Sequence, residues 1–422
     1  MKHALQTGTI GIISLGCPRN LADSERILTR LKAKGFKLVD IKDADTAIIN
    51  TCSFIKEAKE ESIDMILDVI DLKKRGKIKK IIVAGCLPQR YKTELASHLK
   101  EVDAFVGRLS LENYLPKKYS LVPKHFSYVK ISEGCRNKCT YCVIPSIKGK
   151  FVSRSIDSIL KEIRFLETQG AKEINVIGQD ITSYGSDCDN SAGLTDLLKK
   201  IIKTTKKISW IRLLYMHPSH ITKDLIELIA KEKKMCKYID LPLQHINDTI
   251  LKRMNRKVTK VEVVKLITLV RKAIPGVVLR TSFIVGFPGE TEAAFKELLN
   301  FMKEVKFERL GAFMYSREED TPAYSFKNQI PEKIKKQRYE ALMLCQQEIA
   351  TEINRQFLKK ELEILIDEKG QGGGVYLGRT QCDAPEVDGI VYVRSKKRLK
   401  PGDFVRGKIV DTHEYDLVAQ KL

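Results

Sequence analysis

The sequence predicts an α/β protein of three parts. These are an N-terminal parallel α/β sheet domain (residues 8–118), a central partial (β/α)6 barrel (125–355) and a small C-terminal antiparallel β barrel (358–422). Three observations predict this organisation. Apolar β runs alternate with helical periodicity at the start of the chain, which is typical of a parallel sheet covered by helices. The alternation restarts on a larger scale after the proline-punctuated linker 109–124, and turn signals separate short β runs beyond residue 358.

Composition limits the classes of protein. No 18-residue apolar run exists and the chain enters a β run almost at once, so we expect a soluble, cytoplasmic protein with no membrane partner. Lys and Arg number 75 against 53 Asp and Glu, a formal charge of +22. This charge favours RNA or an RNA-containing particle as partner. The alternative is a generally basic proteome with lysine-solvated helices, since charge alone does not establish specific binding.

Three cysteines follow strands of the first part. Strands are expected at 9–15, 44–50, 80–84 and 103–106, and helices at 20–34, 55–72 and up to about residue 99. Cys17, Cys52 and Cys86 each come directly after one of these strands. Because ligands gather outside the carboxyl ends of parallel strands, we expect the three thiols to converge at one edge. The alternative is that each is a small buried hydrophobic residue.

The central part repeats the pattern with six strands. They are expected at 127–132, 173–178, 209–215, 238–241, 277–285 and 309–315, with helices at 155–168, 194–204, 222–231, 261–273 and 292–305. Six units are too few for a closed eight-stranded barrel, so we expect an open barrel with its active site at the carboxyl ends of the strands. His217 and His220 have a spacing that could suit a metal, but we interpret them as solvent-facing polar residues or polar residues at a helix start.

Cys135, Cys139 and Cys142 form a Cys-x3-Cys-x2-Cys run after the first strand of this barrel. Thiolates favour zinc or an iron–sulfur cluster. A zinc site needs a fourth ligand at a paired spacing, and none follows closely. Three cysteines on a 4Fe–4S cluster leave one iron open, because such a cluster normally takes four. The alternatives are a zinc knuckle or three unrelated buried thiols.

The last part begins after a helix predicted at 331–356. Five β runs follow at 362–366, 374–380, 389–393, 404–412 and 417–420, which indicate a barrel of the oligonucleotide-binding type. The isolated cysteines are interpreted as structural: Cys188, Cys236, Cys345 and Cys382.

The cysteine run, with Tyr141 directly before its last Cys, has the spacing of the radical S-adenosylmethionine (SAM) enzymes. The whole chain resembles the methylthiotransferases of that superfamily, which join a three-Cys parallel sheet, a partial barrel and a terminal TRAM barrel. Residues 14–25 (SLGCPRNLADSE), 240–245 (DLPLQH) and 384–393 (APEVDGIVYV) are similar to the branch that modifies an aspartate of small-subunit ribosomal protein S12.

The resemblance implies two 4Fe–4S clusters. One, on Cys135, Cys139 and Cys142, would bind SAM at its open iron and cleave it to a radical that takes hydrogen from the aspartate β-carbon. The other, on Cys17, Cys52 and Cys86, would hold the sulfur to be transferred, and a second SAM would supply the methyl group. The two clusters would face each other across one cavity. The candidate contacts of the cofactor are Tyr141, Gln179, Asp180, Arg280 and Ser282.

The implied partners are ribosomal protein S12, free or in the small subunit, an electron donor and a contact with ribosomal RNA. Two alternatives stay open: a transfer-RNA (adenosine) methylthiotransferase with the same mechanism, and a non-catalytic iron–sulfur module for RNA binding or electron transfer. Asp383, Glu386 and Asp388 of the last part are expected to repel RNA phosphates and to face a basic ribosomal protein.

Overall fold

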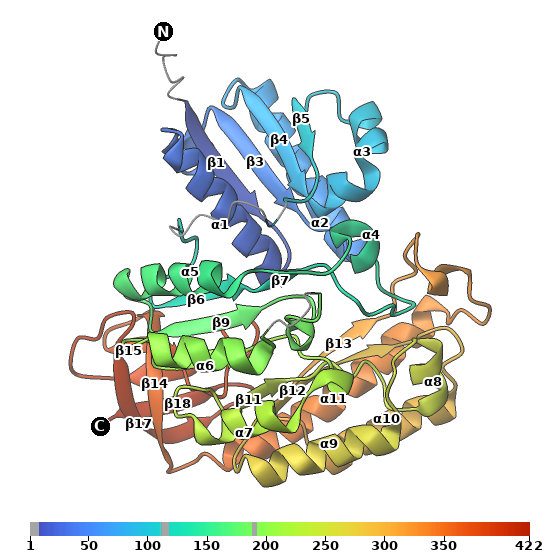
Figure 1. Ribbon diagram of the computed structural model, residues 1–422, viewed down its shortest axis with the longest axis vertical. Helices are drawn as coiled ribbons and strands as arrows, with labels where there is room; N and C mark the ends of the chain where they lie inside the picture. The colour runs from blue at the N-terminus through green and yellow to red at the C-terminus, as the bar shows by residue number, and fades with distance from the viewer. Residues whose placement is uncertain (1–7, 110, 112–117, 188–191) are drawn as a thin grey trace.

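The computed structural model describes residues 8–109, 111, 118–187 and 192–422 (Figure 1). The expected linker 109–124 lies only partly within these ranges, and Cys188 lies outside them. Three parts are visible in Figure 1: a sheet domain at the N-terminus, an open barrel below it, and a small β barrel at the C-terminus.

The N-terminal domain is a five-stranded sheet in the order β2-β1-β3-β4-β5, with all strands parallel. Residues that alternate along the strands pack on opposite faces. Ala47 and Ile49 meet the second and third helices, whereas Ile48 packs with Ile27 and Leu31 of the first. The strands are β1 (Thr9–Ser14), β2 (Lys37–Leu38), β3 (Thr46–Thr51), β4 (Lys80–Gly85) and β5 (Ala104–Val106), and the helices are α1 (Pro18–Ala33), α2 (Lys56–Lys74) and α3 (Cys86–His98).

The central barrel contains six parallel strands in two adjacent sheets, β6-β9-β10 and β11-β12-β13. A bridge between Ile211 and Met235 joins the sheets, and the outer strands of the described barrel, at 126–130 and 309–314, do not pair, so the barrel is open. The strands are β6 (Phe126–Lys130), β9 (Glu173–Ile177), β10 (Trp210–Leu213), β11 (Tyr238–Asp240), β12 (Val278–Val285) and β13 (Arg309–Met314). The covering helices are α5 (Ile156–Thr168), α6 (Leu194–Thr204), α7 (Lys223–Lys231), α9 (Lys260–Ala273) and α10 (Glu292–Val305).

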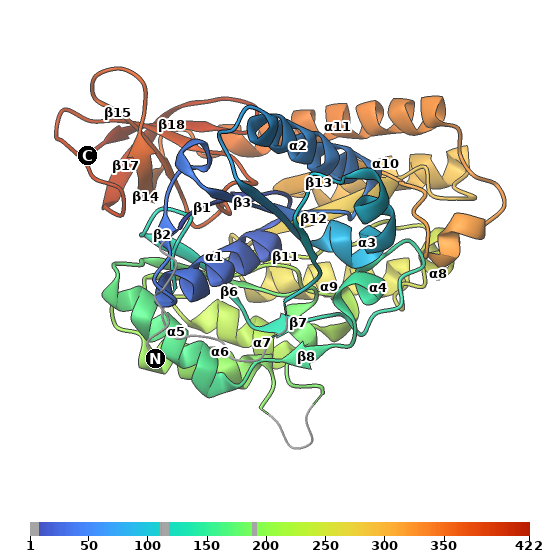
Figure 2. The same cartoon turned by 90° about the horizontal axis from the view of Figure 1, so that it is seen from above.

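Several short elements of the chain were not predicted because they lack enough residues to show a period. They are β2 (Lys37–Leu38), β7 (Ser132–Glu133), β8 (Val152–Ser153), α4 (Ile144–Lys148), α8 (Asp248–Arg253) and four single turns of 3-10 helix (Ile41–Asp43, Ile181–Ser183, Pro218–His220, Pro322–Ser325). Two of them, α4 and α8, matter for the site. Helix α4 follows the Cys135–Cys142 loop directly and contacts α3 of the N-terminal domain, as Figure 2 shows from above.

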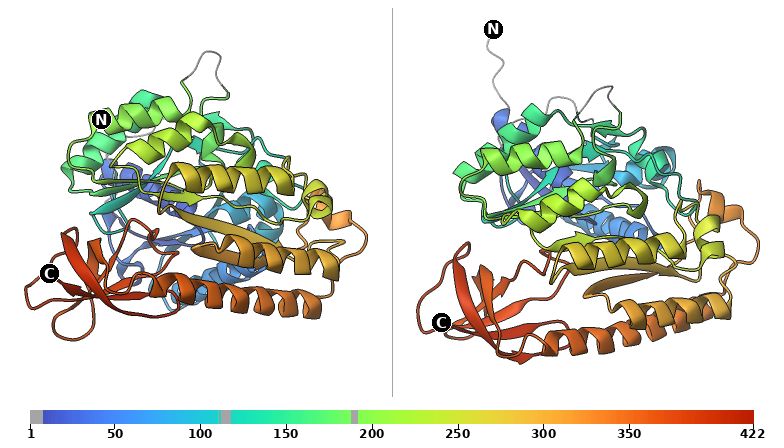
Figure 3. Two further views of the ribbon diagram at one scale, coloured as in Figure 1. Left: turned by 90° about the horizontal axis from the view of Figure 1, so that it is seen from below. Right: turned by 60° about the horizontal axis from the view of Figure 1, so that its bottom comes forward.

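Helix α11 (Glu332–Arg355) packs against β13 and α10 and leads into the C-terminal barrel (Figure 3). The barrel closes in the order β14-β15-β16-β18-β17. One pairing differs from the antiparallel barrel expected, because β16 and β18 run parallel while β17 forms the hairpin with β18. The strands are β14 (Glu361–Lys369), β15 (Val375–Arg379), β16 (Val391–Arg394), β17 (Phe404–Thr412) and β18 (Leu417–Lys421).

The three carboxylates expected to face a ribosomal protein turn towards the chain's own barrel. Asp383 accepts a hydrogen bond from Arg309 Nε at 2.9 Å, Asp388 accepts one from the Tyr238 hydroxyl at 2.5 Å, and Glu386 accepts one from the Tyr128 hydroxyl at 2.9 Å. The Asp383 and Asp388 side chains are only 2% and 4% exposed. The expectation is therefore wrong for these two residues, because they stabilise the junction between the C-terminal barrel and the central one.

No helix of the described residues combines the length and apolarity needed to span a membrane.

Candidate active site between two sets of cysteines

The structure brings Cys17, Cys52 and Cys86 together at the carboxyl edge of the N-terminal sheet. Cys17 caps α1, Cys52 follows β3 and Cys86 begins α3. Gly16 has a φ of +83°, and a Cβ placed there would lie 2.7 Å from the Cys52 Cβ. The chain can therefore bring these two cysteine loops into contact only because residue 16 is glycine. We name Cys17, Cys52 and Cys86 the N-terminal set.

Cys135, Cys139 and Cys142, the barrel set, lie on one loop after β7. Gly134 opens this loop with a φ of +75°, and a Cβ there would meet the Lys150 carbonyl oxygen at 2.3 Å. The loop is held to the region of α8, where Thr140 Oγ1 donates to the Arg253 carbonyl oxygen at 2.8 Å and Asn255 Nδ2 donates to the Lys138 carbonyl oxygen at 2.7 Å. These bonds fix the positions of the three thiols before any cofactor binds.

Two side chains adjoin the barrel set directly. Arg256 Nη1 lies 3.8 Å from Cys139 Sγ, and its Nη2 donates to the Pro242 carbonyl oxygen at 2.6 Å. Tyr141 packs edge-on against the Phe287 ring, with 6.5 Å between centroids, and burial raises its pKa well above the usual range. Arg256 can therefore donate a hydrogen bond to a ligand sulfur, and Tyr141 stays protonated.

The thiols of both sets are free, so none is used in a disulfide. Burial and, to a smaller extent, the neighbouring thiols of each set raise the pKa of Cys86 and of Cys142 to about 12. Cys17 differs. Burial acts to raise its pKa as well, but the charge and hydrogen bond of Arg19, the Asn20 amide and the charge of Lys148 together lower it. Thiols this close, all buried or half-buried, are suited to a shared soft-metal centre.

Each set contains three cysteines, which is the number of protein ligands that a cluster with one open iron would take. A 4Fe–4S cluster is wider than an ion and is held by thiolates on separate irons. Each set offers three free thiols within electrostatic range of one another, which fits a cluster with three protein ligands.

Two cations lie where the sets meet. Arg19 lowers the pKa of Cys17 in the N-terminal set and also acts against the burial that raises the pKa of Cys142 in the barrel set. Lys148 of α4 acts in the same direction on Cys86 and Cys17. Cys86 itself packs against Val143 and Ile147, which lie one and five residues after the barrel set. The two cysteine sets therefore lie next to each other in the fold, although about fifty residues separate Cys86 from Cys135 in the sequence.

A buried ion network holds the two domains in this relation. Lys130 of β6 pairs with Asp23 of α1 and, at 2.6 Å, with Glu133 of β7. Lys148 pairs with the same two carboxylates, at 3.2 Å and 3.6 Å. All four side chains are almost completely buried. Removing one member would leave an uncompensated buried charge, which costs about 3–5 kcal/mol, so the network enforces the alignment of the domains.

The remaining predicted cofactor residues lie at strand ends or in the barrel wall. Gln179 donates to Glu133 Oε1 at 3.0 Å, and its own Oε1 is buried without a hydrogen-bond partner. Asp180 accepts a bond from Asn137 of the cysteine loop at 2.8 Å and pairs with His220 at 2.9 Å. Arg280 pairs with Asp240 at 3.0 Å, and Ser282 is buried in β12.

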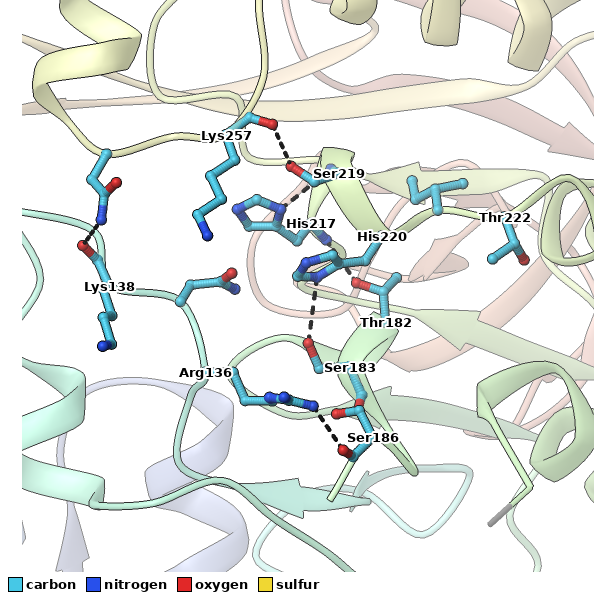
Figure 4. Close-up of a pocket in the computed structure, with 13 residues that line it drawn as sticks. Arg136, Lys138, Thr182, Ser183, Ser186, His217, Ser219, His220, Thr222 and Lys257 are labelled. Atoms are coloured by element: carbon cyan, nitrogen blue, oxygen red, sulfur yellow. Dashed lines mark hydrogen bonds between the residues drawn. The ribbon is translucent and has the colours of Figure 1, made fainter. Parts of the chain in front are cut away.

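A pocket of about 800 Å³ lies beside the cysteine loop (Figure 4). Its wall includes Arg136, Lys138 and Lys257, so it is basic. The His217 and His220 rings stack there with 4.8 Å between centroids, and His217 Nδ1 accepts the Ser219 amide bond at the start of a 3-10 helix. This agrees with the helix-start interpretation of His217.

Sequence reasoning did not single out Arg19, Lys148, Tyr215 or Arg256. Arg19 lies only two residues from Cys17, which is a usable signal. Arg256 and Tyr215 are far from any cysteine in sequence, and only the fold brings them to the site. The arrangement that results is two adjacent sets of free thiols, one on a single loop and one on three strand ends, with cations between them.

Comparisons with known proteins define the class. Residues 129–302 match the Radical SAM superfamily, residues 9–107 match the uncharacterized protein family UPF0004, and residues 360–421 match the TRAM domain. Among solved structures, a radical S-adenosylmethionine methyltransferase, TsrM, from Kitasatospora setae is similar in fold. Its TM-score is 0.56 at 12% identity, covering 81% of this chain and 89% of that one. The molecule is a radical SAM enzyme, a class that uses a 4Fe–4S cluster and SAM.

Sequence relatives narrow the class. The ribosomal protein uS12 methylthiotransferase RimO of Clostridioides difficile (strain 630) is 46% identical over 98% of this chain and 98% of its own length. The protein of the same name from Geobacter sulfurreducens is 44% identical over 97% and 98%. The chain belongs to the ribosomal protein uS12 methylthiotransferase family and is a radical SAM methylthiotransferase.

Proposed function

We propose that this enzyme places a methylthio group on the β-carbon of an aspartate of ribosomal protein uS12. The observation that carries the proposal is the pair of free cysteine sets, with Arg19 beside a thiol of each. A β-carbon C–H bond is not acidic enough for a side-chain base, so a radical cofactor is required. Sulfur insertion then needs a sulfur source next to the place where hydrogen is removed. Two adjacent cysteine sets could hold both the radical cofactor and the sulfur source.

We propose that each set holds one 4Fe–4S cluster. The barrel set would leave an iron open for SAM, and the N-terminal set would hold the cluster that presents sulfur. When bound, the cluster and SAM on the barrel set supply one-electron cleavage of a sulfonium, which makes removal of an unactivated hydrogen feasible. The free thiols and the glycines beside Cys17 and Cys135 support this assignment.

The chain's own groups bind and orient. Arg256 donates a hydrogen bond to the Cys139 sulfur when that sulfur is a ligand. Gln179 Oε1 and Ser132 Oγ are buried without hydrogen-bond partners at the strand ends, and buried polar atoms of this kind need a partner. We assign them to the polar groups of SAM. Asp180, through Asn137, holds the cysteine loop in place.

Partners follow from the reaction. The protein substrate is uS12, free or in the small subunit, and the TRAM barrel suits a contact with ribosomal RNA during that encounter. An electron donor must supply the reducing equivalents for SAM cleavage. Since ribosomal proteins are made and assembled in the cytoplasm, we place the enzyme there.

The test uses anaerobically reconstituted protein with SAM, a reductant and two substrates in parallel: recombinant uS12, and transfer RNA that carries isopentenyl-adenosine. Mass spectrometry then seeks a gain of one methylthio group. A gain on an aspartate of uS12 alone is expected. A gain on the RNA alone would keep the chemistry but overturn the substrate, and 5′-deoxyadenosine formed without a gain on either would overturn the proposal.

A further inference from the structure

We propose that Arg19 binds the carboxylate of the target aspartate and so makes the enzyme specific for an acidic side chain. The inference rests on the proposed function and extends it to a residue that touches the substrate. Three observations support the inference: the position of Arg19 between the cysteine sets, its lack of a carboxylate partner among the described residues, and the fixed conformation of the tyrosine on which it stacks.

Arg19 occupies the junction of the two cysteine sets. It follows Cys17 by two residues, at the start of α1, and it acts electrostatically on both Cys17 and Cys142. Its guanidinium carbon lies 4.6 Å from the centroid of the Tyr215 ring. Part of the guanidinium hydrogen-bonds the Cys17 thiol, and stacking on the ring leaves its other N–H groups in the plane of the fork able to bind a further acceptor. The residue as a whole is half-buried.

Arg19 has no carboxylate partner among the described residues. The other cations near the site have partners in the chain. Lys148 pairs with Asp23 and Glu133, and Arg280 pairs with Asp240. Arg256 also lacks a carboxylate, but its two terminal nitrogens bind the Cys139 sulfur and the Pro242 carbonyl oxygen. A guanidinium at the junction of two domains, without a carboxylate of its own, is a candidate to receive one from outside.

Tyr215, the platform, is fixed in an unusual conformation. It follows β10 with a φ of +67°, which a residue other than glycine rarely adopts. Two hydrogen bonds hold it there. Its amide donates to Asp240 Oδ2 at 2.7 Å, and its carbonyl oxygen accepts the Ile181 amide at 3.1 Å. Arg280 in turn donates to Asp240 Oδ1 at 3.0 Å. Backbone strain that is held so firmly is typical of a functional site, because the fold must stabilise it elsewhere.

The chemistry of an aspartate substrate explains why an arginine would be needed between the two cysteine sets. The carbon that gains sulfur must lie between the two cysteine sets, and in aspartate the carboxylate is bonded directly to that carbon. A carboxylate taken out of water needs a charged partner and hydrogen bonds. A planar guanidinium offers both, with two parallel N–H bonds that fix the carboxylate's orientation. An adenosine carries no carboxylate, so the same arginine gives no advantage to an RNA base.

The experiment compares binding of two forms of uS12 to the reconstituted holoenzyme, measured as Kd by fluorescence anisotropy. One form carries the target aspartate and the other carries asparagine there, which keeps the shape and removes the charge. We expect the wild-type enzyme to prefer the aspartate form by about tenfold or more. Arg19→Gln should lose this preference, with nearly equal Kd values, and Arg19→Lys should keep part of it.

Two controls keep the result interpretable. Arg317→Gln removes an arginine that also lies on a tyrosine ring, 4.5 Å from the Tyr324 centroid, and it should leave the preference intact. Iron content and 5′-deoxyadenosine formed without uS12 show whether Arg19→Gln still holds its clusters. If it does not, Tyr215→Leu, which removes the platform and leaves Arg19, takes its place and should weaken the preference.

The outcomes separate this inference from the proposed function. A loaded Arg19→Gln enzyme that still prefers the aspartate form would overturn the role of Arg19. So would a wild-type enzyme that modifies uS12 but binds both forms equally. A wild-type enzyme that never modifies uS12 would overturn the proposed function itself.

Discussion

The two cysteine sets bring three thiols together by different structural means. The barrel set lies on a single eight-residue loop, Cys135 to Cys142, and its geometry is local. The N-terminal set comes from three strand ends spread over about seventy residues, and its geometry depends on a whole sheet. The first can be recognised from spacing alone. The second exists only when the domain is folded.

The residues around the two sets also differ, since one set is held by local hydrogen bonds and the other depends on contacts between separate loops. The barrel set is held by hydrogen bonds to the α8 region and adjoins Arg256. The N-terminal set depends on Gly16, whose missing Cβ lets two loops touch, and on the charges of Arg19 and Lys148. A cluster on the barrel set should therefore tolerate changes to the N-terminal sheet, whereas a cluster on the N-terminal set should respond to small changes in sheet geometry.

The largest effect should come from removing each set separately. Replacing Cys135, Cys139 and Cys142 with Ala should reduce both 5′-deoxyadenosine formation and methylthio transfer to background, because SAM has no iron to bind. Replacing Cys17, Cys52 and Cys86 should abolish methylthio transfer and leave 5′-deoxyadenosine formation within a few-fold of wild type. Chromatography and mass spectrometry measure the two products. If the second variant also lost SAM cleavage, the sets would not have separate roles.

Arg256→Gln should lower SAM cleavage by about 10- to 100-fold, the usual cost of losing a group that supports a metal ligand. Without its hydrogen bond to the Cys139 sulfur, the barrel cluster should also become harder to reduce. A redox titration followed by electron paramagnetic resonance tests this. Arg253→Gln is the matched control, since that guanidinium lies over the Phe326 ring. An unchanged potential in Arg256→Gln would show that the contact has no electronic role.

A smaller effect should follow from Gly16→Ala. The new Cβ would meet Cys52 at 2.7 Å in a left-handed conformation, so we expect a loss of about 2 kcal/mol in the free energy of unfolding and loss of iron from the N-terminal set only. Gly76→Ala is the control, because Gly76 has a similar φ of +72° with open space around it. Denaturant unfolding and iron analysis compare the two variants. Equal effects would attribute the loss to backbone strain rather than to contact between the loops.

The smallest and most local difference concerns thiol reactivity in iron-free protein. The thiolate is the reactive form, so a lower pKa means reaction at lower pH. Cys17, whose pKa Arg19 helps to lower, should be alkylated by iodoacetamide at a lower pH than Cys86 and Cys142, which have pKa values of about 12. Peptide mapping across pH 6–10 measures each rate. Similar rates for Cys17 and Cys142 would contradict the stated effect of Arg19.

Local patterns in the sequence predict the strands and the cysteine sites but not the contacts between domains. Hydrophobic periodicity locates the strands, and the rule that parallel strands end at one edge predicts that Cys17, Cys52 and Cys86 converge. The pairing of Asp383 with Arg309 could not be foreseen, since a carboxylate in a polar run is usually exposed. The roles of Arg256 and Tyr215 could not be foreseen either, because they depend on long-range packing, which leaves no local pattern.

Iron analysis of the two triple-alanine variants tests the central claim most directly. After anaerobic reconstitution, each variant should retain about half of the wild-type iron and sulfide, with a Mössbauer spectrum of one 4Fe–4S cluster. A variant lacking all six cysteines should retain almost none. If loss of one set removed all the iron, or if loss of the N-terminal set removed none, the two sets would not hold two separate clusters.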